Sequence, residues 1–171
     1  SGDYVFWSNK GDESDMTLTQ AFDFSQVSGP LTLKYSTWYD LETEYDYVHV
    51  VVSEDGENWT VLRGTSTTDE NPVGNSYGWG YTGVSSGWLD EEVDLSAYAG
   101  KKVQVRFEYV TDAAVNGDGM LLDDLSIPEI GYSSDLEQDE GGWQAAGWVR
   151  VNPVLPQTYR VTLIRMDGTT E

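Results

Sequence analysis

The chain lacks cysteine, has few basic residues and contains no long apolar run. Without Cys among its 171 residues, disulfides, zinc–thiolate sites and thiol redox chemistry are excluded. Nine Lys and Arg against 30 Asp and Glu give a net charge of −21. This balance argues against nucleic acid and anionic membranes as partners, because both are bound through basic clusters. No apolar run approaches the ~20 residues that span a bilayer.

Histidine is nearly absent, and this disfavours most catalytic machinery. His49 is the single His and lies among valines, where a packed strand residue is expected. A zinc peptidase site needs paired His with a nearby Glu, and no nucleophile elbow for a Ser–His–Asp triad is present. Composition leaves open a glycosidase that uses two carboxylates. We therefore expect a domain that is not an enzyme.

The residues that are present predict an all-β fold. Apolar residues alternate over residues 16–24, 31–39 and 103–109, residues 47–53 form a valine-rich run, and residues 59–63 and 120–127 add further strands. No segment has convincing helical periodicity. Strands at this spacing, separated by Gly, Asp and Asn turns, predict an antiparallel β-sandwich of the jelly-roll type.

The composition changes after residue 130. We expect a sandwich over residues 3–130 and a C-terminal extension over residues 131–171, either packed on the sandwich or beginning a next module. Within the extension, residues 147–152 and 158–165 are predicted strands.

Two acidic motifs are the first candidates for a Ca²⁺ site, since this cation prefers six to eight hard oxygen ligands. The loop at residues 9–15 offers Asn9, Asp12 and Asp15, although by spacing alone a plain Asp-rich turn explains it better. In the second motif, Asp123 and Asp124 are adjacent inside an apolar strand, so one of them is expected to point inward. A buried carboxylate must be paired, hydrogen-bonded or metal-bound, and backbone amides are the alternative to a metal.

A third acidic segment, residues 40–46, connects two core strands. Asp40, Glu42 and Asp46 could complete a cation site there. The same acids could line a sugar-binding groove with Trp38 and Tyr45, or they could form a solvated turn.

The long irregular stretch at residues 64–87 suggests another function. Loops of this length in a compact domain are usually functional or disordered. It carries or borders four aromatic residues that could bind carbohydrate or pack the loop onto the sheet: Tyr77, Trp79, Tyr81 and Trp88.

Seven phrases, taken in order, resemble a known family. They are residues 7–12 (WSNKGD), 38–42 (WYDLE), 45–48 (YDYV), 53–59 (SEDGENW), 93–100 (VDLSAYAG), 105–112 (VRFEYVTD) and 119–124 (GMLLDD). In this order they resemble the non-catalytic, MAM-like β-sandwich of immune inhibitor A-type secreted bacterial metallopeptidases. The resemblance covers roughly residues 3–130, and residues 143–161 resemble the segment that follows.

The resemblance implies an accessory domain of a secreted, multidomain bacterial protein whose zinc catalytic domain is separate. Its partners would be other domains of the parent chain, with polysaccharide or an extracellular protein as further possibilities. Sandwiches of this kind commonly carry structural Ca²⁺, and the resemblance extends that role to residues 9–15 and to Asp123 and Asp124. A carbohydrate-binding module that uses the loop aromatics is the alternative.

Overall fold

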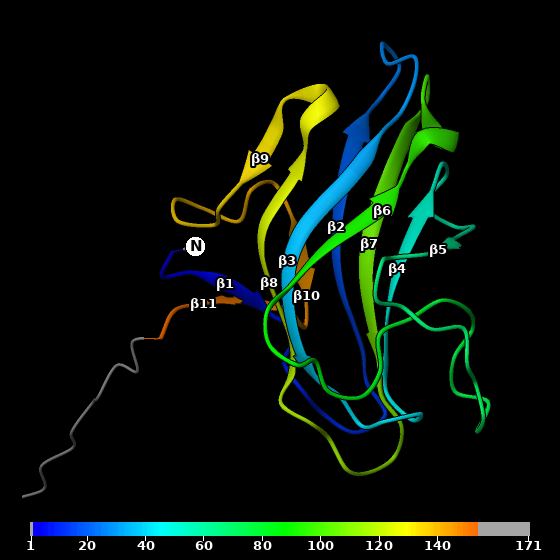
Figure 1. Ribbon diagram of the computed structural model, residues 1–171, viewed down its shortest axis with the longest axis vertical. Coiled ribbons are helices and arrows are strands. Elements are labelled where there is room, and N and C mark those ends of the chain that lie inside the picture. The colour runs from blue at the N-terminus through cyan, green and yellow to red at the C-terminus, as the bar shows by residue number, and fades with distance from the viewer. Residues whose placement is uncertain (1, 154–171) are drawn as a thin grey trace, which may run out of the picture.

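In a computed structural model that describes residues 2–153, two antiparallel sheets pack face to face (Figure 1). Sheet A has the order β11 (Val149–Val151), β1 (Val5–Trp7), β8 (Gly119–Ile127), β3 (Thr32–Asp40) and β6 (Leu89–Asp94), and β9 (Tyr132–Ser134) also pairs with β8. Sheet B has the order β10 (Gln144–Ala146), β2 (Asp15–Asp23), β7 (Lys102–Val110), β4 (Tyr47–Ser53) and β5 (Thr60–Leu62). Two short 3₁₀ turns, η1 (Ser96–Tyr98) and η2 (Pro128–Ile130), are the helical segments of these residues. The predicted antiparallel sandwich is confirmed.

Period-two alternation builds the core, because successive strand residues face opposite sides of a sheet. In β7, Val105, Phe107 and Tyr109 are fully buried, whereas Gln104 and Arg106 between them are partly exposed. The same alternation in β2, β3 and β8 fills the space between the sheets. Each fully buried aliphatic or aromatic side chain contributes roughly 1.5–3 kcal/mol.

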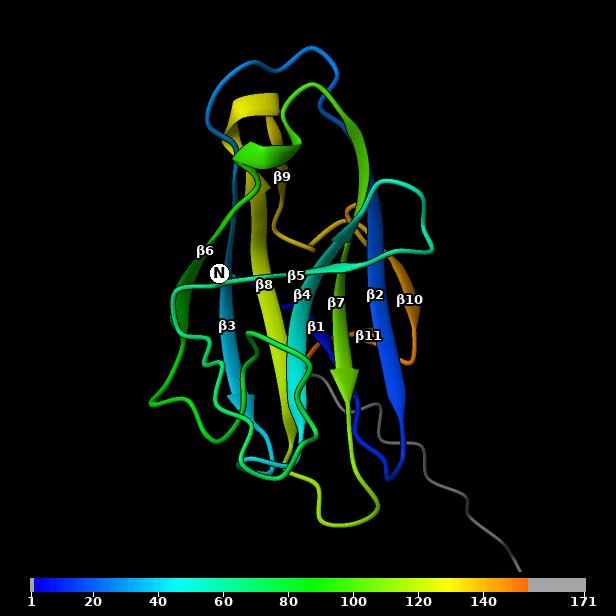
Figure 2. The same cartoon turned by 90° about the vertical axis from the view of Figure 1, so that its right-hand side faces the viewer.

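Strand β4 departs from this alternation because all seven of its residues are buried. Val48, Val50 and Val52 face the core. The opposite face is covered by the loop at residues 64–87, which runs beside β4 (Figure 2). Tyr77 of this loop stacks on His49, with ring centroids 3.9 Å apart, and the backbone of Tyr81 pairs with that of Val48.

The segment after residue 130 joins both sheets. Strand β9 pairs with β8, β10 pairs with β2, and β11 pairs with β1. Between β10 and β11, Trp148 is buried and donates from Nε1 to the carbonyl oxygen of Met16 at 3.0 Å. Strand β11 falls within the predicted strand at residues 147–152. The predicted strand at residues 158–165 lies outside the described residues.

Three loops meet at one end of the sandwich, the lower end in Figures 1 and 2. They connect β1 to β2, β3 to β4, and β7 to β8. The backbone N–H of Glu13 donates to the carbonyl of Asp112 at 2.6 Å, and that of Thr111 donates to Ser14 at 3.0 Å. Gly117 lies against the backbone of Asp40 so closely that a Cβ there would meet its carbonyl oxygen. The acidic segments of these loops are therefore held beside one another.

Candidate metal site at one end of the sandwich

Glu42, Asp46 and Asp112 bring three carboxylates together where these loops meet. Asp46 immediately precedes β4 and Asp112 follows β7, and the two strands pair with Tyr47 opposite Val110. One oxygen from each of the three carboxylates lies within 4.8 Å of the other two. The pairing of β4 with β7 thus joins residues that are 66 positions apart in the chain.

Asp46 is the buried member of this carboxylate cluster, with an exposed fraction of 0%. Its Oδ2 accepts a hydrogen bond from the Tyr109 hydroxyl at 3.1 Å, and its Oδ1 accepts one from the Asp112 backbone N–H at 3.1 Å. Burial raises the pKa of Asp46, the two hydrogen bonds oppose that rise, and the carboxylates of Glu42 and Asp112 add to it. Desolvation of the negative charge is therefore only partly offset by the protein's own groups.

Glu42 supplies an oxygen without a partner. Its Oε2 is completely buried and has no hydrogen-bond partner within the described part of the chain. Among the ion pairs of residues 2–153, none involves Glu42, Asp46 or Asp112. Three carboxylates that converge without a basic partner among the described residues repel one another, and such a group could bind a metal ion.

The backbone around Glu42 is fixed by a tight turn. The Asp46 N–H donates to the Glu42 carbonyl at 3.0 Å, and the Thr82 hydroxyl donates to the same carbonyl at 3.2 Å. Glu44 has φ 72°, a left-handed conformation that closes the turn. Thr82 also accepts from the Glu44 N–H at 2.9 Å, so the long loop clamps the carboxylate-bearing turn.

The loop at residues 9–15 lies beside the carboxylate cluster but contributes no member to it. Asn9 has φ 65° and uses its side-chain oxygen to accept from the Lys10 N–H at 3.0 Å. Asp12 is exposed and accepts from Asn116. Asp15 begins β2 and is exposed, because the neighbouring Met16 takes the inward position. Asn9 therefore contacts its own loop, Asp12 contacts the loop between β7 and β8, and neither Asp12 nor Asp15 belongs to the carboxylate cluster.

Asp123 and Asp124 lie at a β-bulge in sheet A. Lys34 pairs with Ser126 and Ser36 pairs with Asp123, so two steps along β3 correspond to three along β8. Asp124 is the additional residue and has φ 51°. Leu122 and Leu125, on either side of the pair, both face the core. The expectation that one Asp points inward is wrong, because the bulge lets both acids avoid the core: Asp123 is buried on the outer side and Asp124 is exposed.

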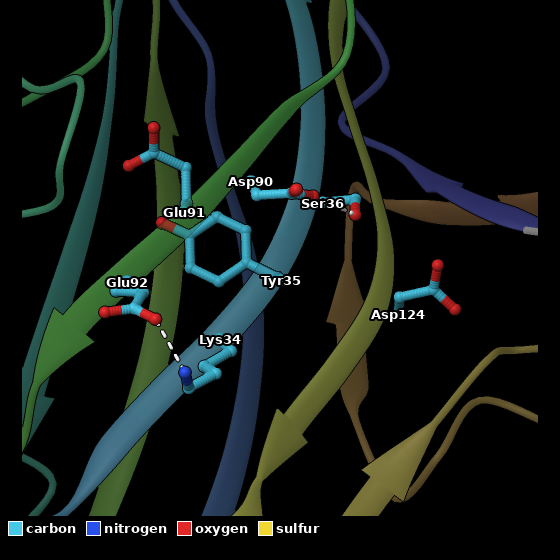
Figure 3. Close-up of a pocket in the computed structure, with 7 residues that line it drawn as sticks. All are labelled: Lys34, Tyr35, Ser36, Asp90, Glu91, Glu92 and Asp124. Carbon is cyan, nitrogen blue, oxygen red and sulfur yellow. Dashed lines mark hydrogen bonds and ion pairs between the residues drawn. The ribbon is translucent and has the colours of Figure 1, made fainter.

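Glu91 is the acid that does point into the sandwich, and the sequence reasoning missed it. Its exposed fraction is 1%, and its Oε2 accepts from the Tyr81 hydroxyl at 2.7 Å and from the Ser66 N–H at 3.1 Å. Tyr35 and Tyr81 share a hydrogen bond of 2.6 Å. In Figure 3, Glu91 and Tyr35 lie close together. Glu91 and the apolar Val93 are two positions apart in one strand, so alternation places both on the same face of the sheet. This was the sequence signal that could have identified Glu91 as an inward-facing acid.

The four aromatic residues in or beside the long loop do not form one platform. Tyr81 is fully buried in the core, and Tyr77 covers His49 and donates to Glu108 at 2.6 Å. The ring of Trp79 lies under the Arg63 guanidinium, 4.2 Å from the ring centroid. Trp88 is 51% exposed and lies next to β6. Trp88 and Tyr77 are the two most exposed of these four residues, at 51% and 47%, and of the two only Tyr77 stacks on another ring of the domain among the described residues.

A family model described as the immune inhibitor A-like MAM domain matches residues 1–152. The chain belongs to this family. The match includes residues 131–152, the segment that supplies β9, β10 and β11.

Curated relatives of this family member are much longer proteins. The chain is 31% identical over 140 residues to the pre-pro-metalloprotease PrtV of Vibrio cholerae, a match of 82% of this chain and 15% of the relative. It is 32% identical over 142 residues to immune inhibitor A of Bacillus thuringiensis subsp. alesti, covering 80% of this chain and 19% of the relative. Bacillopeptidase F of Bacillus subtilis is 29% identical over 163 residues, which are 92% of this chain and 10% of the relative.

The chain therefore spans less than a fifth of the length of these relatives. It corresponds to an accessory MAM-type domain of larger peptidases, whose catalytic part lies elsewhere in those proteins. No helix among the described residues is long and apolar enough to cross a membrane.

Proposed function

We propose that this domain is a calcium-stabilised accessory unit of a secreted, multidomain bacterial protein of the metallopeptidase type. The observation that carries the calcium assignment is the convergence of Glu42, Asp46 and Asp112, with Asp46 fully buried and Glu42 Oε2 without a hydrogen-bond partner among residues 2–153. Membership of the MAM family and the length of the relatives support the accessory role. The partners in this proposal are the other domains of the parent chain.

Calcium fits this donor set on chemical grounds. The carboxylate cluster consists of hard oxygens from two separate loops, and Ca²⁺ accepts six to eight such ligands in flexible geometry. Three carboxylates exceed the charge of one divalent ion, so binding would remove most of their mutual repulsion. Softer metals favour His and Cys ligands, and the cluster contains neither. Backbone carbonyls and water would complete the coordination.

The test is the calcium dependence of stability, measured after the chain has been unfolded in urea with EDTA and refolded without metal. This step removes an ion that chelator cannot reach in the native state. Calcium at a hundredfold excess over Kd should raise the free energy of unfolding by about 2.7 kcal/mol. Magnesium at the same concentration controls for non-specific screening. Equal stability with calcium and with EDTA would refute the calcium assignment and leave the family assignment untouched.

Carbohydrate binding is a second candidate function, independent of calcium. The observation that favours it is the exposed Trp88, which lines a surface hollow together with Ser36, Asp123 and Asp124. Indole rings stack on sugar rings, and carboxylates accept the protons of sugar hydroxyls. Retention on insoluble cellulose, chitin or xylan tests this function, and no retention on any of them would contradict it.

A further inference from the structure

The outer face of sheet A carries a row of apolar side chains that crosses four strands. Trp7 on β1 pairs with Val149 on β11 and with Leu121 on β8, and Leu121 pairs with Trp38 on β3. Their neighbours Phe6, Leu122 and Tyr39 belong to the core, so these four side chains face outward. Trp7 and Trp38 are two strand spacings apart, about 10 Å. The side chains of Trp7, Leu121 and Trp38 are partly exposed, and that of Val149 is 40% exposed.

Trp88 extends this row at the β6 edge. Thr37 pairs with Leu89, so the next antiparallel step places Trp88 opposite Trp38. Its side chain forms a wall of a hollow of about 360 Å³, whose other lining residues are Gly2, Val5, Ser36, Asp123 and Asp124. This volume lies within the ~300–1,000 Å³ of small-molecule sites. The hollow thus joins an exposed aromatic ring to hydroxyl and carboxylate groups.

Polar groups continue from this hollow along the sheet. The Ser36 hydroxyl donates to Asp90 Oδ1 at 3.1 Å. A second hollow of about 350 Å³ is also lined by Ser36, Asp90 and Asp124, so the two depressions share a border. Figure 3 shows Asp90 beside Ser36, with Asp124 on the neighbouring strand. The bulge at Asp124 places its carboxylate at this shared border.

The outer face of sheet B differs in how its aromatic side chains are engaged. Tyr77 and the rest of the long loop cover His49 on β4. Trp59 lies under the Arg106 guanidinium, 3.8 Å from its ring centroid. Tyr77 is 47% exposed, close to the 51% of Trp88, but its ring stacks on His49 and its hydroxyl donates to Glu108, whereas Trp88 lines the hollow.

We propose that the outer face of sheet A binds a neutral polysaccharide, with a sugar ring stacked on Trp88 and hydroxyls donating to Asp90, Asp123 or Asp124. The inference rests on the second candidate function and supplies its site. The net charge of −21 repels uronic and sulfated polysaccharides. A basic peptide could use the same acids, but the uncharged row of Trp7, Leu121 and Trp38 matches the apolar face of a sugar chain better than a series of cations.

The experiment measures binding of soluble hexasaccharides of cellulose, xylan, chitin, laminarin and mannan by calorimetry, with Trp88→Ala as the test variant. Trp59→Ala is the matched control on the opposite sheet. We expect one hexasaccharide to bind, Trp88→Ala to weaken it about tenfold or more, and Trp59→Ala to change it less than about twofold. Trp88→Phe should restore part of the affinity, because the flat aromatic face is retained.

Two further measurements separate the ligand classes. Binding of a neutral sugar should be unchanged between about 0.05 and 0.5 M NaCl, whereas a cationic peptide would be released by salt. Asp124→Asn retains a side chain that tolerates positive φ and tests the role of the carboxylate.

Lack of binding to every hexasaccharide would overturn both the site and carbohydrate binding as a function. Binding that Trp88→Ala leaves unchanged would overturn the site alone. Salt-sensitive capture of an oligoarginine peptide that requires Trp88, without sugar binding, would assign the surface to a basic partner instead.

Discussion

Asp46 and Glu91 are both buried acids in one sandwich, yet their surroundings differ. Glu91 accepts through Oε2 from two neutral donors, the Tyr81 hydroxyl and the Ser66 N–H, at 2.7 and 3.1 Å, while its buried Oε1 has no hydrogen-bond partner in the described part of the chain. Asp46 also accepts two hydrogen bonds, but two more carboxylates converge on it. Glu91 lies among neutral groups, whereas Asp46 shares its site with two other carboxylates whose mutual repulsion a bound cation would relieve.

Substitution of Glu91 is expected to have the largest effect on stability, and it tests whether this acid is independent of calcium. Glu91→Ala should lower the free energy of unfolding by about 3 kcal/mol, because the buried Tyr81 hydroxyl and the partly buried Ser66 N–H lose their acceptor at ~1–3 kcal/mol each. The loss should be the same with calcium and with EDTA in urea unfolding. Glu92→Ala, one position along, removes only an exposed ion pair with Lys34 and should cost less than about 1 kcal/mol. If Glu91→Ala lowered the free energy of unfolding only in the presence of calcium, Glu91 would depend on the ion as Asp46 is expected to do.

Asp46→Asn tests whether the second buried acid is a calcium ligand. The variant should lose the calcium-dependent increment of about 2.7 kcal/mol at a hundredfold excess, while its metal-free form is at least as stable as the metal-free native chain. The reason is that the substitution removes a buried charge together with a ligand. Asp124→Asn is the control and should keep the whole increment, since Asp124 lies at the bulge of β8. The reverse pattern would place the ion at the bulge.

His49 is expected to have a smaller effect on stability, which also arises from the burial of an ionisable group. Its Nδ1 is 2.9 Å from the Trp79 carbonyl, and its buried Nε2 has no hydrogen-bond partner in the described part of the chain. Burial lowers the pKa of His49, against smaller opposing contributions from the Trp79 carbonyl and Glu108. Because the folded pKa lies below the unfolded value, stability is fully present above pH ~6.5 and is lost as pH falls below it.

The expected loss is about 1 kcal/mol on going from pH 6.5 to 5.5, read from urea unfolding across that range. His49→Phe keeps a flat ring against Tyr77 and should remove this part of the pH dependence. An identical slope in the variant would assign the titration to another group. Hydrogen exchange at residues 76–81 should report the same change locally, because that part of the loop covers His49.

The strands could be predicted because alternation is local, and the predicted run at residues 47–53 coincides with β4. The carboxylate cluster could not be assembled in full, although Glu42 and Asp46 were among the candidates. Asp112 was missed because its proximity to Asp46 depends on the pairing of β4 with β7. At Asp123 and Asp124 the alternation rule failed because a bulge inserts one residue into the register. Local periodicity thus finds strands, whereas sites depend on which strands become neighbours.

The pairing of β1 with β11 has a mechanical consequence. The two strands are antiparallel, with Val5 opposite Val151 and Trp7 opposite Val149. Tension applied through the chain before β1 and after β11 would therefore load Val5 and Val151 first and separate the strands one pair at a time. Peeling of this kind yields at lower force than shearing, which loads every hydrogen bond together. In a multidomain protein under stress, this edge of sheet A would open before the loops that hold Glu42, Asp46 and Asp112.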